Sequence, residues 1–298
     1  MKIILTGSLG HIGRPLTALL VQKGHDVTVI SSSSEKQNSI RALGATPAIG
    51  TIEDTDFLTA TFSRADIVYT MVPPPRFSDP NVDLVADMAK IIDNYHQAIR
   101  RSGIKRIVHL SSIGAHMDQG SGIIIGHHHA EALLNLLPDV AITFMRPVGF
   151  YYNLNMFTGL IRATGRISSN YGADDMIPWV SPSDIAEAIA KEIGIPPVER
   201  KILYVASDEL TCNQVAAILG AAIGKPGITW TLITDGELQK RYESVGMNTK
   251  IAAGLVQMQA SMHSGKFYED YYRNRPAPGK IKMTDFANEF AASYHKSE

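Results

Sequence analysis

Short apolar runs alternate with longer amphipathic segments through the first half of the chain. The runs are rich in Val and Ile without alternating polar positions, which predicts strands that are buried on both faces of a sheet. They occupy residues 2–6, 26–30, 67–72, 106–110 and 140–145. Between them, apolar residues recur at steps of three and four over 12–22 and 82–99, which predicts two helices. This order predicts an α/β fold, in which helices cover both faces of a doubly wound parallel sheet.

The pattern changes after Pro147, where helices with marked beginnings replace the alternation. At three places a hydroxyl residue precedes a helical run and has an acidic or amide residue three positions later, which predicts a capping box. These pairs are Ser181 with Asp184, Thr211 with Gln214, and Thr234 with Glu237. One apolar run at 202–206 is expected to return to the main sheet. We therefore expect a sheet domain over residues 1–150 and a smaller, mostly helical C-terminal region over residues 151–298.

Composition excludes several classes of function. The 298 residues include 28 basic and 29 acidic side chains, and this balance lacks the positive charge of a protein that binds nucleic acid. Cys212 is the only cysteine, so neither an internal disulfide nor a zinc site built from cysteines can form. No apolar run approaches the roughly 18 residues of a membrane span, and the apolar N-terminal run is too short for a signal peptide. We expect a cytoplasmic globular protein.

A glycine-rich turn joins the first predicted strand to the first predicted helix. Gly7, Gly10 and Gly13 are three residues apart. In dinucleotide-binding turns of this kind the first glycine allows the tight turn, the second lets the backbone approach a pyrophosphate, and the third permits close contact of helix and strand. The position of the motif favours a bound dinucleotide over a plain glycine-rich turn. The residues expected to contact it are Gly7, Leu9, Gly10, His11, Ile12, Gly13 and Arg14.

The residues after the second strand indicate which dinucleotide is bound. An NAD site usually places an acidic residue there to bind the ribose 2′-hydroxyl. This chain has serines instead, followed by Lys36, and they are placed to receive a 2′-phosphate together with Arg14. The pattern favours NADP(H) over NAD, although a serine run also forms plain polar turns. The further expected cofactor contacts are Ser31, Ser32, Ser33 and Lys36 after this strand, and Met71, Val72, Pro73 and Ser111 near the ends of later strands.

The glycine turn and the segment 107–112 (IVHLSS) together resemble the extended short-chain dehydrogenase/reductase superfamily, whose members have the Rossmann fold. Four stretches narrow the resemblance to its atypical, NmrA-like branch: 10–16, 130–134, 145–147 and 179–186. The resemblance covers nearly the whole chain. It implies an NAD(P)-binding Rossmann domain and a C-terminal region that closes a substrate cleft.

The resemblance also points to two residues near the reacting atoms. Ser112 falls on the serine or threonine position of active members, whereas their tyrosine and lysine are replaced by Ile123 and His127. In those members the tyrosine donates a proton after the lysine has lowered its pKa. Without this pair we expect neither alcohol dehydrogenation nor sugar-nucleotide epimerisation. His127 is the candidate proton donor, and Ser112 is expected to orient the acceptor or the nicotinamide.

Two functions fit these residues. One is an NADPH-dependent oxidoreductase that transfers hydride to a small conjugated acceptor such as a quinone or a dye, a reaction that mainly needs proximity and orientation. The other is a non-catalytic regulatory protein of the NmrA type that senses NAD(P). The segments 73–77 and 150–152 and the side chain of Trp179 are expected to line an acceptor pocket, which favours the reductase. The expected partner is a small-molecule acceptor, with no nucleic acid bound directly and no membrane, and the sequence is compatible with a homodimer.

Other conspicuous residues have structural interpretations. Three adjacent histidines at 127–129 point about 100° apart on a helix and cannot hold one ion together, so we expect no metal site. The aromatic and acidic segment 267–272 is expected to serve packing or a subunit contact. Phe286, Phe290 and Tyr294 recur at steps of four, which predicts the buried stripe of a closing helix.

Overall fold

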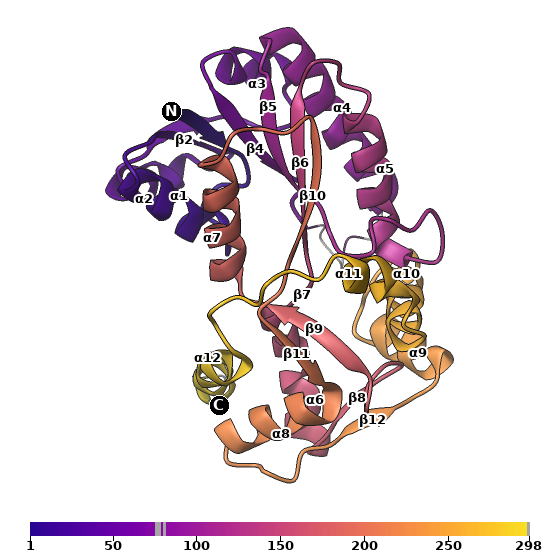
Figure 1. Cartoon of the computed structure of the whole chain (residues 1–298). Coiled ribbons are helices and arrows are strands. Elements are labelled where there is room, and N and C mark those ends of the chain that lie inside the picture. Colours follow the sequence, from indigo (N-terminus) through magenta and orange to yellow (C-terminus); the bar gives the residue numbers. More distant parts are fainter. Residues whose placement is uncertain (75–78, 80–81, 297–298) are drawn as a thin grey trace.

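A computed structural model describes residues 1–74, 79 and 82–296 of the chain (Figure 1). Its centre is a seven-stranded sheet with the order β10-β6-β5-β4-β1-β2-β3, in which all neighbours are parallel. The strands are β1 (Lys2–Leu5), β2 (Asp26–Ser31), β3 (Thr46–Ile49), β4 (Ile67–Met71), β5 (Arg106–Leu110), β6 (Ala141–Pro147) and β10 (Arg200–Val205). The predicted α/β fold with a doubly wound parallel sheet is confirmed.

Helices cover both faces of this sheet because successive strand residues point to opposite sides. On one face, Leu5 joins a core with α1 (Gly13–Gln22), α2 (Gln37–Ala42) and α7 (Pro182–Ile193). On the other face, Ile4 joins a core with α3 (Thr55–Phe62), α4 (Leu84–Ser102) and α5 (Ile125–Leu134). The helix predicted at 82–99 begins two residues later, because Asp83 caps it by accepting a hydrogen bond from the Ala86 N–H at 3.2 Å.

Two of the three predicted capping boxes are confirmed. Thr211 and Gln214 begin α8 (Cys212–Ala222), and Thr234 and Glu237 begin α9 (Asp235–Ser244), each with both reciprocal hydrogen bonds. At α7 the predicted capping box is wrong in its second half, the reciprocal hydrogen bond to Asp184. Ser181 accepts from the backbone N–H of Ser183, but the carboxylate of Asp184 turns inward. It accepts instead from the hydroxyl of Ser207 and from the backbone N–H groups of Lys280 and Ile281.

The C-terminal region adds two small sheets and further helices in the lower half of Figure 1. The sheets contain β7 (Gly149–Phe150), β9 (Met176–Val180) and β11 (Asp208–Thr211) in one, and β8 (Ile167–Ser169) and β12 (Trp230–Leu232) in the other. The further helices are α6 (Thr158–Thr164), α10 (Thr249–His263), α11 (Glu269–Arg273) and α12 (Met283–Lys296), with the 3₁₀ turns η3 (Tyr151–Phe157) and η4 (Lys266–Tyr268). The sheet domain contains the 3₁₀ turns η1 (Ser34–Lys36) and η2 (Gly122–Ile124). The segment expected to return to the main sheet lies in β10, which pairs with β6.

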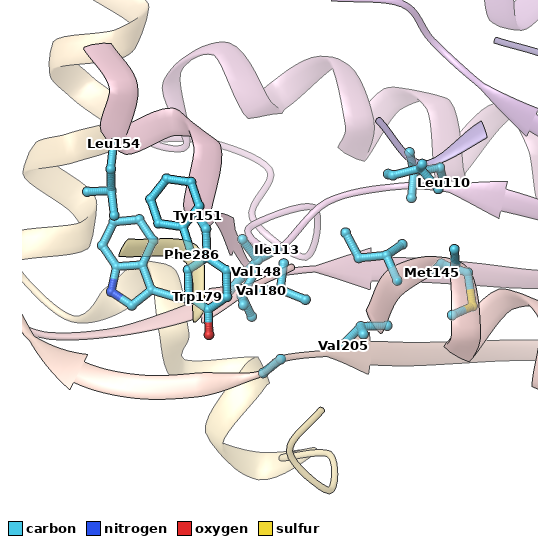
Figure 2. Close-up of a cluster of buried hydrophobic side chains, with 14 of the residues drawn as sticks. Leu110, Ile113, Met145, Val148, Tyr151, Leu154, Trp179, Val180, Val205 and Phe286 are labelled. Atoms are coloured by element: carbon cyan, nitrogen blue, oxygen red, sulfur yellow. The ribbon is translucent and has the colours of Figure 1, made fainter. Parts of the chain in front are cut away.

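One buried cluster continues from the main sheet into the C-terminal region (Figure 2). Leu110, Met145 and Val205 stand at the ends of adjacent strands, and the cluster extends from them to Tyr151 and Phe286, whose rings stack at 5.6 Å between centroids. The predicted stripe on α12 is buried as expected. The shared core fixes the C-terminal region against the sheet edge where the strands end. Among the described helices, none is long and apolar enough to cross a membrane.

Candidate functional site

The strand order places a crevice at the carboxyl ends of β1 and β4. These two strands are neighbours at the centre of the sheet, and the chain leaves them in opposite directions along it. In open parallel sheets, ligands bind at this switch point. The loops that follow β1, β4 and β5 carry the glycine turn, residues 72–74 and the pair Ser111-Ser112. The topology therefore brings most of the predicted site residues to one edge.

Each glycine of the turn has its own steric environment. Gly7 has φ +85°, and a Cβ there would lie 2.7 Å from the sulfur of Met71. A Cβ at Gly13 would overlap the carbonyl oxygen of Ser8, so α1 packs directly on the turn. Gly10 is different because it is exposed, and a Cβ there would meet nothing closer than the Gly7 carbonyl oxygen at 3.6 Å. Protein packing thus requires Gly7 and Gly13, whereas Gly10 leaves open space toward the crevice.

The first turn of α1 is suited to an anion. Its N-cap residue, Ile12, has no side chain that can cap the helix, and the turn contains no acidic residue. The first backbone N–H groups of a helix have no partner within it, and the helix dipole favours negative charge there. Within the turn, His11 is exposed and Leu9 is partly buried, while Arg14 is exposed one residue into the helix. These features fit the pyrophosphate of a dinucleotide.

The serines after β2 divide into two kinds. Ser31 is 3% exposed, and its hydroxyl accepts from the Ser8 hydroxyl at 3.0 Å and from the Ser33 N–H at 3.3 Å. This side chain ties the glycine turn to the end of β2. Ser32 and Lys36 are exposed, and Ser33 is partly buried. Among the ion pairs of the described residues, none involves Lys36 or Arg14, so both cations are available to a phosphate group.

The end of β4 lies under the glycine turn. The backbone N–H of Met71 donates to the Thr6 hydroxyl at 3.0 Å, and its carbonyl accepts from the Tyr95 hydroxyl at 2.9 Å. Val72 is partly buried and Pro73 is exposed at the crevice edge. Of the segment 73–77 that was expected to line an acceptor pocket, residues 75–77 lie outside the described part of the chain.

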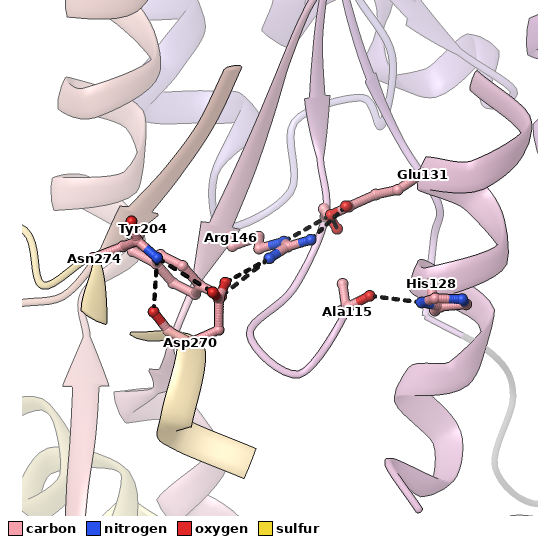
Figure 3. Close-up of polar contacts among 8 residues, drawn as sticks. Ala115, His128, Glu131, Arg146, Tyr204, Asp270 and Asn274 are labelled. Carbon is pink, nitrogen blue, oxygen red and sulfur yellow. Dashed lines mark hydrogen bonds and ion pairs between the residues drawn. The ribbon is translucent and has the colours of Figure 1, made fainter. Parts of the chain in front are cut away.

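Glu131 and Arg146 form a buried ion pair that sequence reasoning did not predict (Figure 3). The guanidinium of Arg146 donates to both carboxylate oxygens of Glu131, at 2.9 and 2.6 Å, and the Ser111 hydroxyl donates to the same carboxylate at 2.5 Å. Arg146 also donates to the Tyr204 hydroxyl at 3.1 Å and to Asp270 at 3.0 Å. Burial by itself would lower the pKa of Arg146, but the hydrogen bonds and charge of Glu131 raise it overall. The guanidinium of Arg146 therefore stays charged.

This network joins Glu131 of α5, Ser111 directly after β5 and Arg146 of β6 to α11 of the C-terminal region. The one signal available in the sequence is an arginine inside the apolar run 140–147, because such a charge must find a buried partner. The predicted cofactor contact Ser111 uses its hydroxyl in this network and is 3% exposed. Its neighbour Ser112 is partly exposed, and its hydroxyl makes no hydrogen bond to the described residues.

The three adjacent histidines point to different surroundings. His127 is partly exposed, its Nδ1 is buried without a partner among the described residues, and burial lowers its pKa to about 4. His128 contacts the Ala115 carbonyl through Nδ1 at 3.0 Å, as Figure 3 shows, and His129 is exposed. His127 is therefore neutral near pH 7. Within the described residues, no three His, Cys, Asp or Glu side chains lie together so as to hold a metal ion.

Aromatic side chains connect the glycine turn to the C-terminal region. The ring of His11 stacks on Tyr152, with centroids 4.4 Å apart, and Tyr152 also contacts Phe150 at 5.2 Å. The expectation that Trp179 and Tyr151 line an acceptor pocket is wrong. Trp179 is 3% exposed within the shared core, and Tyr151 is 1% exposed with its hydroxyl bound to Asp208. Phe150 and Tyr152 are the members of that set beside the crevice.

Comparison with known families agrees with this geometry. Residues 7–194 match the protein family described as NAD(P)H-binding. The chain belongs to this family. The match covers the glycine turn, all strands of the main sheet except β1 and β10, and the residues of the Glu131–Arg146 pair. The expectation of an NAD(P)-type cofactor is confirmed at this level.

Two curated proteins match parts of the chain. An uncharacterized protein of Schizosaccharomyces pombe is 38% identical over 71 residues, which are 24% of this chain and 24% of that protein. The 4-hydroxy-2-methyl-3-oxo-4-farnesyl-3,4-dihydroquinoline-1-oxide ketoreductase of Stigmatella aurantiaca is 27% identical over 112 residues, which are 38% of this chain and 34% of that enzyme. The chain thus matches about a quarter of the length of the first relative and about a third of the length of the second.

Solved structures share the fold over nearly the whole chain. An NADPH-dependent quinone oxidoreductase from Escherichia coli, complexed with NADPH, superposes with a TM-score of 0.79 at 20% identity and covers 99% of both chains. A triphenylmethane reductase of Citrobacter sp., complexed with NADP(H), gives 0.75 at 18% identity over 97% of this chain and 100% of that one. A nucleoside-diphosphate-sugar epimerase from Staphylococcus aureus gives 0.78 at 17% identity over 97% and 100%. The predicted Rossmann fold is confirmed, while the NmrA-like branch stays a prediction.

Proposed function

We propose that this protein is an NADPH-dependent reductase of a small conjugated acceptor such as a quinone or a dye. The observation that carries the proposal is the composition of the crevice edge. It combines an uncapped α1 beside an open Gly10 with the unpaired cations Arg14 and Lys36, and it has isoleucine and a neutral histidine where related enzymes hold tyrosine and lysine. The two solved structures with NADP(H) are named as a quinone and a dye reductase, which supports the choice of acceptor.

Different residues of the crevice bind the cofactor and orient the acceptor. The turn at Gly7–Gly13 binds the pyrophosphate, and Arg14, Ser32, Ser33 and Lys36 bind the 2′-phosphate. When bound, NADPH supplies the hydride. Ser112 offers a free hydroxyl to orient the acceptor, and Phe150 and Tyr152 offer aromatic faces to a planar ring.

The proton requirement explains why such an acceptor suits this site. A quinone that takes a hydride becomes a stabilised anion, so its proton can arrive afterwards from water, and a cationic triphenylmethane dye becomes neutral and needs no proton. A simple ketone instead needs an acid in the transition state. With a pKa of about 4, His127 is neutral near pH 7 and has no imidazolium proton to donate. The site therefore favours acceptors that need little acid catalysis.

One experiment tests the proposal. The purified protein is titrated with NADPH and NADH, and NADPH oxidation is then followed with menadione and a triphenylmethane dye. We expect NADPH to bind at least tenfold more tightly than NADH, and its oxidation to depend on the acceptor. Tight binding without oxidation by any acceptor would overturn the reductase and favour the NAD(P)-sensing regulator. One observation supports this regulator. Burial lowers the pKa of His109 to about 3 and of His127 to about 4, so neither imidazole is a charged acid near pH 7.

A further inference from the structure

Two glycines bring η2 and α10 into direct backbone contact. Gly122 has φ +57°, and a Cβ there would overlap the carbonyl oxygen of Gly254. A Cβ at Gly254 would in turn lie 2.8 Å from Cγ2 of Ile123. Both glycines line a hollow beside this contact, and a second hollow lies along the later part of α10. The two hollows share one residue, Gln257, and differ in chemistry.

The first hollow has a volume of about 400 Å³ and lies between the beginning of α4, η2 and α10. Its lining is mainly apolar and includes Leu84, Val85, Ile123, Ile251, Ala253 and Gly254. Charged groups stand at its rim, where Lys250 Nζ and Asp83 Oδ2 are 4.0 Å apart and both side chains are mostly exposed. The hollow is therefore an apolar surface with a charged edge.

The second hollow, about 610 Å³, is bordered by the loop 117–120 and the later turns of α10. Polar side chains dominate it, among them Gln119, Ser261, Ser264 and Lys266. A polar hollow is compatible with water alone. The apolar one leaves hydrophobic surface in water, which is unfavourable unless a ligand covers it.

The apolar hollow lies close along the chain to the candidate proton donor. Ile123, which lines the hollow, stands four residues before His127, about one helical turn along the run from η2 into α5. A ligand whose reactive ring lies near His127 therefore has the lining of the hollow about one helical turn away.

We propose that this hollow binds a linear apolar tail, alkyl or isoprenoid, carried by the conjugated ring of the acceptor. The inference rests on the proposed reductase function. Among the described residues of the lining, Gln257 has the one polar side chain apart from the rim pair. A tail therefore suits the lining better than a second ring with oxygen atoms, because unpaired oxygens would lose hydrogen bonds to water. A chain of methylenes needs no partner and gains from burial along its length.

The test is a series of 2-alkyl benzoquinones with side chains of zero to ten carbons, each measured for equilibrium binding in the presence of NADP⁺ and for kcat/KM with NADPH. Each buried methylene is expected to strengthen binding by about three- to fourfold until the hollow is filled, after which the values level off. Val85→Glu places a charge in the lining at an exposed position of the first turn of α4, where a carboxylate favours the helix. It is expected to flatten the dependence on chain length.

Val245→Glu is the matched control, because Val245 is an exposed valine outside the lining and is 76% exposed. It is expected to keep the wild-type dependence. Binding that does not change with chain length in the wild type, or an equal dependence in Val85→Glu, would overturn the tail site. If the quinone without a side chain is still reduced, either of these results would refute the tail site alone and would leave the proposed reductase function standing. Chain-length-dependent binding without any NADPH oxidation would instead support the tail site and refute the reductase.

Discussion

Replacing Arg146 by Met provides a sharp test of the buried network. The substitution keeps an apolar stem of similar length and removes four hydrogen bonds, two to Glu131 and one each to Tyr204 and Asp270. The carboxylate of Glu131 then remains buried, with its side chain 8% exposed and the Ser111 hydroxyl as its remaining partner from this network. Breaking a buried pair by removing one partner costs about 3–5 kcal/mol, because the other charge is left uncompensated.

The assay is urea unfolding followed by circular dichroism. With a slope of about 3 kcal/mol per molar urea, the expected loss lowers the midpoint by roughly 1–2 M. Arg101→Met is the matched control, since Arg101 pairs with Asp56 at 2.7 Å but their side chains are 51% and 83% exposed. Pairs of that kind contribute about 0–1 kcal/mol. Amide exchange in α11 reports in addition whether Asp270 has lost its attachment to the sheet.

The double variant Glu131→Leu with Arg146→Met removes both charges. Replacing a buried pair with apolar residues of similar volume is often neutral, so the double variant is expected to regain most of the lost stability. The reasoning would be refuted by an Arg146→Met variant within about 1 kcal/mol of the wild type, or by a double variant no more stable than the single one.

The remaining predictions concern the crevice and the buried histidines. Gly10→Ala is expected to weaken NADPH binding at least tenfold with little change in the urea midpoint. Gly13→Ala is expected to lower the midpoint, because its Cβ overlaps Ser8. The opposite order of effects would contradict the roles of Gly10 in cofactor binding and Gly13 in packing. Lys36→Glu is expected to reduce the preference for NADPH over NADH, measured by titration with both, and an unchanged ratio would remove Lys36 from the 2′-phosphate site. As pH falls from 6.5 to 4, the free energy of unfolding is expected to decrease, because unfolded histidines bind protons near pH 6.5 while burial lowers the pKa of His127 to about 4 and of His109 to about 3. In that window each of the two histidines changes the free energy of unfolding by about 1.4 kcal/mol per pH unit. Urea unfolding at pH 7 and pH 5 should therefore show a smaller loss of unfolding free energy between these pH values for His109→Phe than for the wild type. An equal loss would refute the argument.

Features that depend on a few neighbouring residues could be predicted from the sequence. The periodicity of apolar residues predicted the parallel sheet and the helices that cover it, because burial on one or two faces constrains each element separately. The steric limit on Gly13 and the capping boxes at Thr211 and Thr234 are also local, since each involves atoms within a few positions of chain. The spacing of the glycines and the missing tyrosine and lysine were readable in the same way.

The pairing of side chains far apart in the sequence became visible in the folded structure alone. Arg146 reaches Glu131 across 15 positions and Asp270 across 124, and the Ser111 hydroxyl turns to this network rather than to the crevice. Trp179 was expected to line a pocket and is buried, because its strand packs on the shared core. The apolar hollow arises where Gly122 meets Gly254, two glycines that are unremarkable in the sequence. Such contacts depend on the order of the strands and on the docking of the C-terminal region, which local periodicity does not encode.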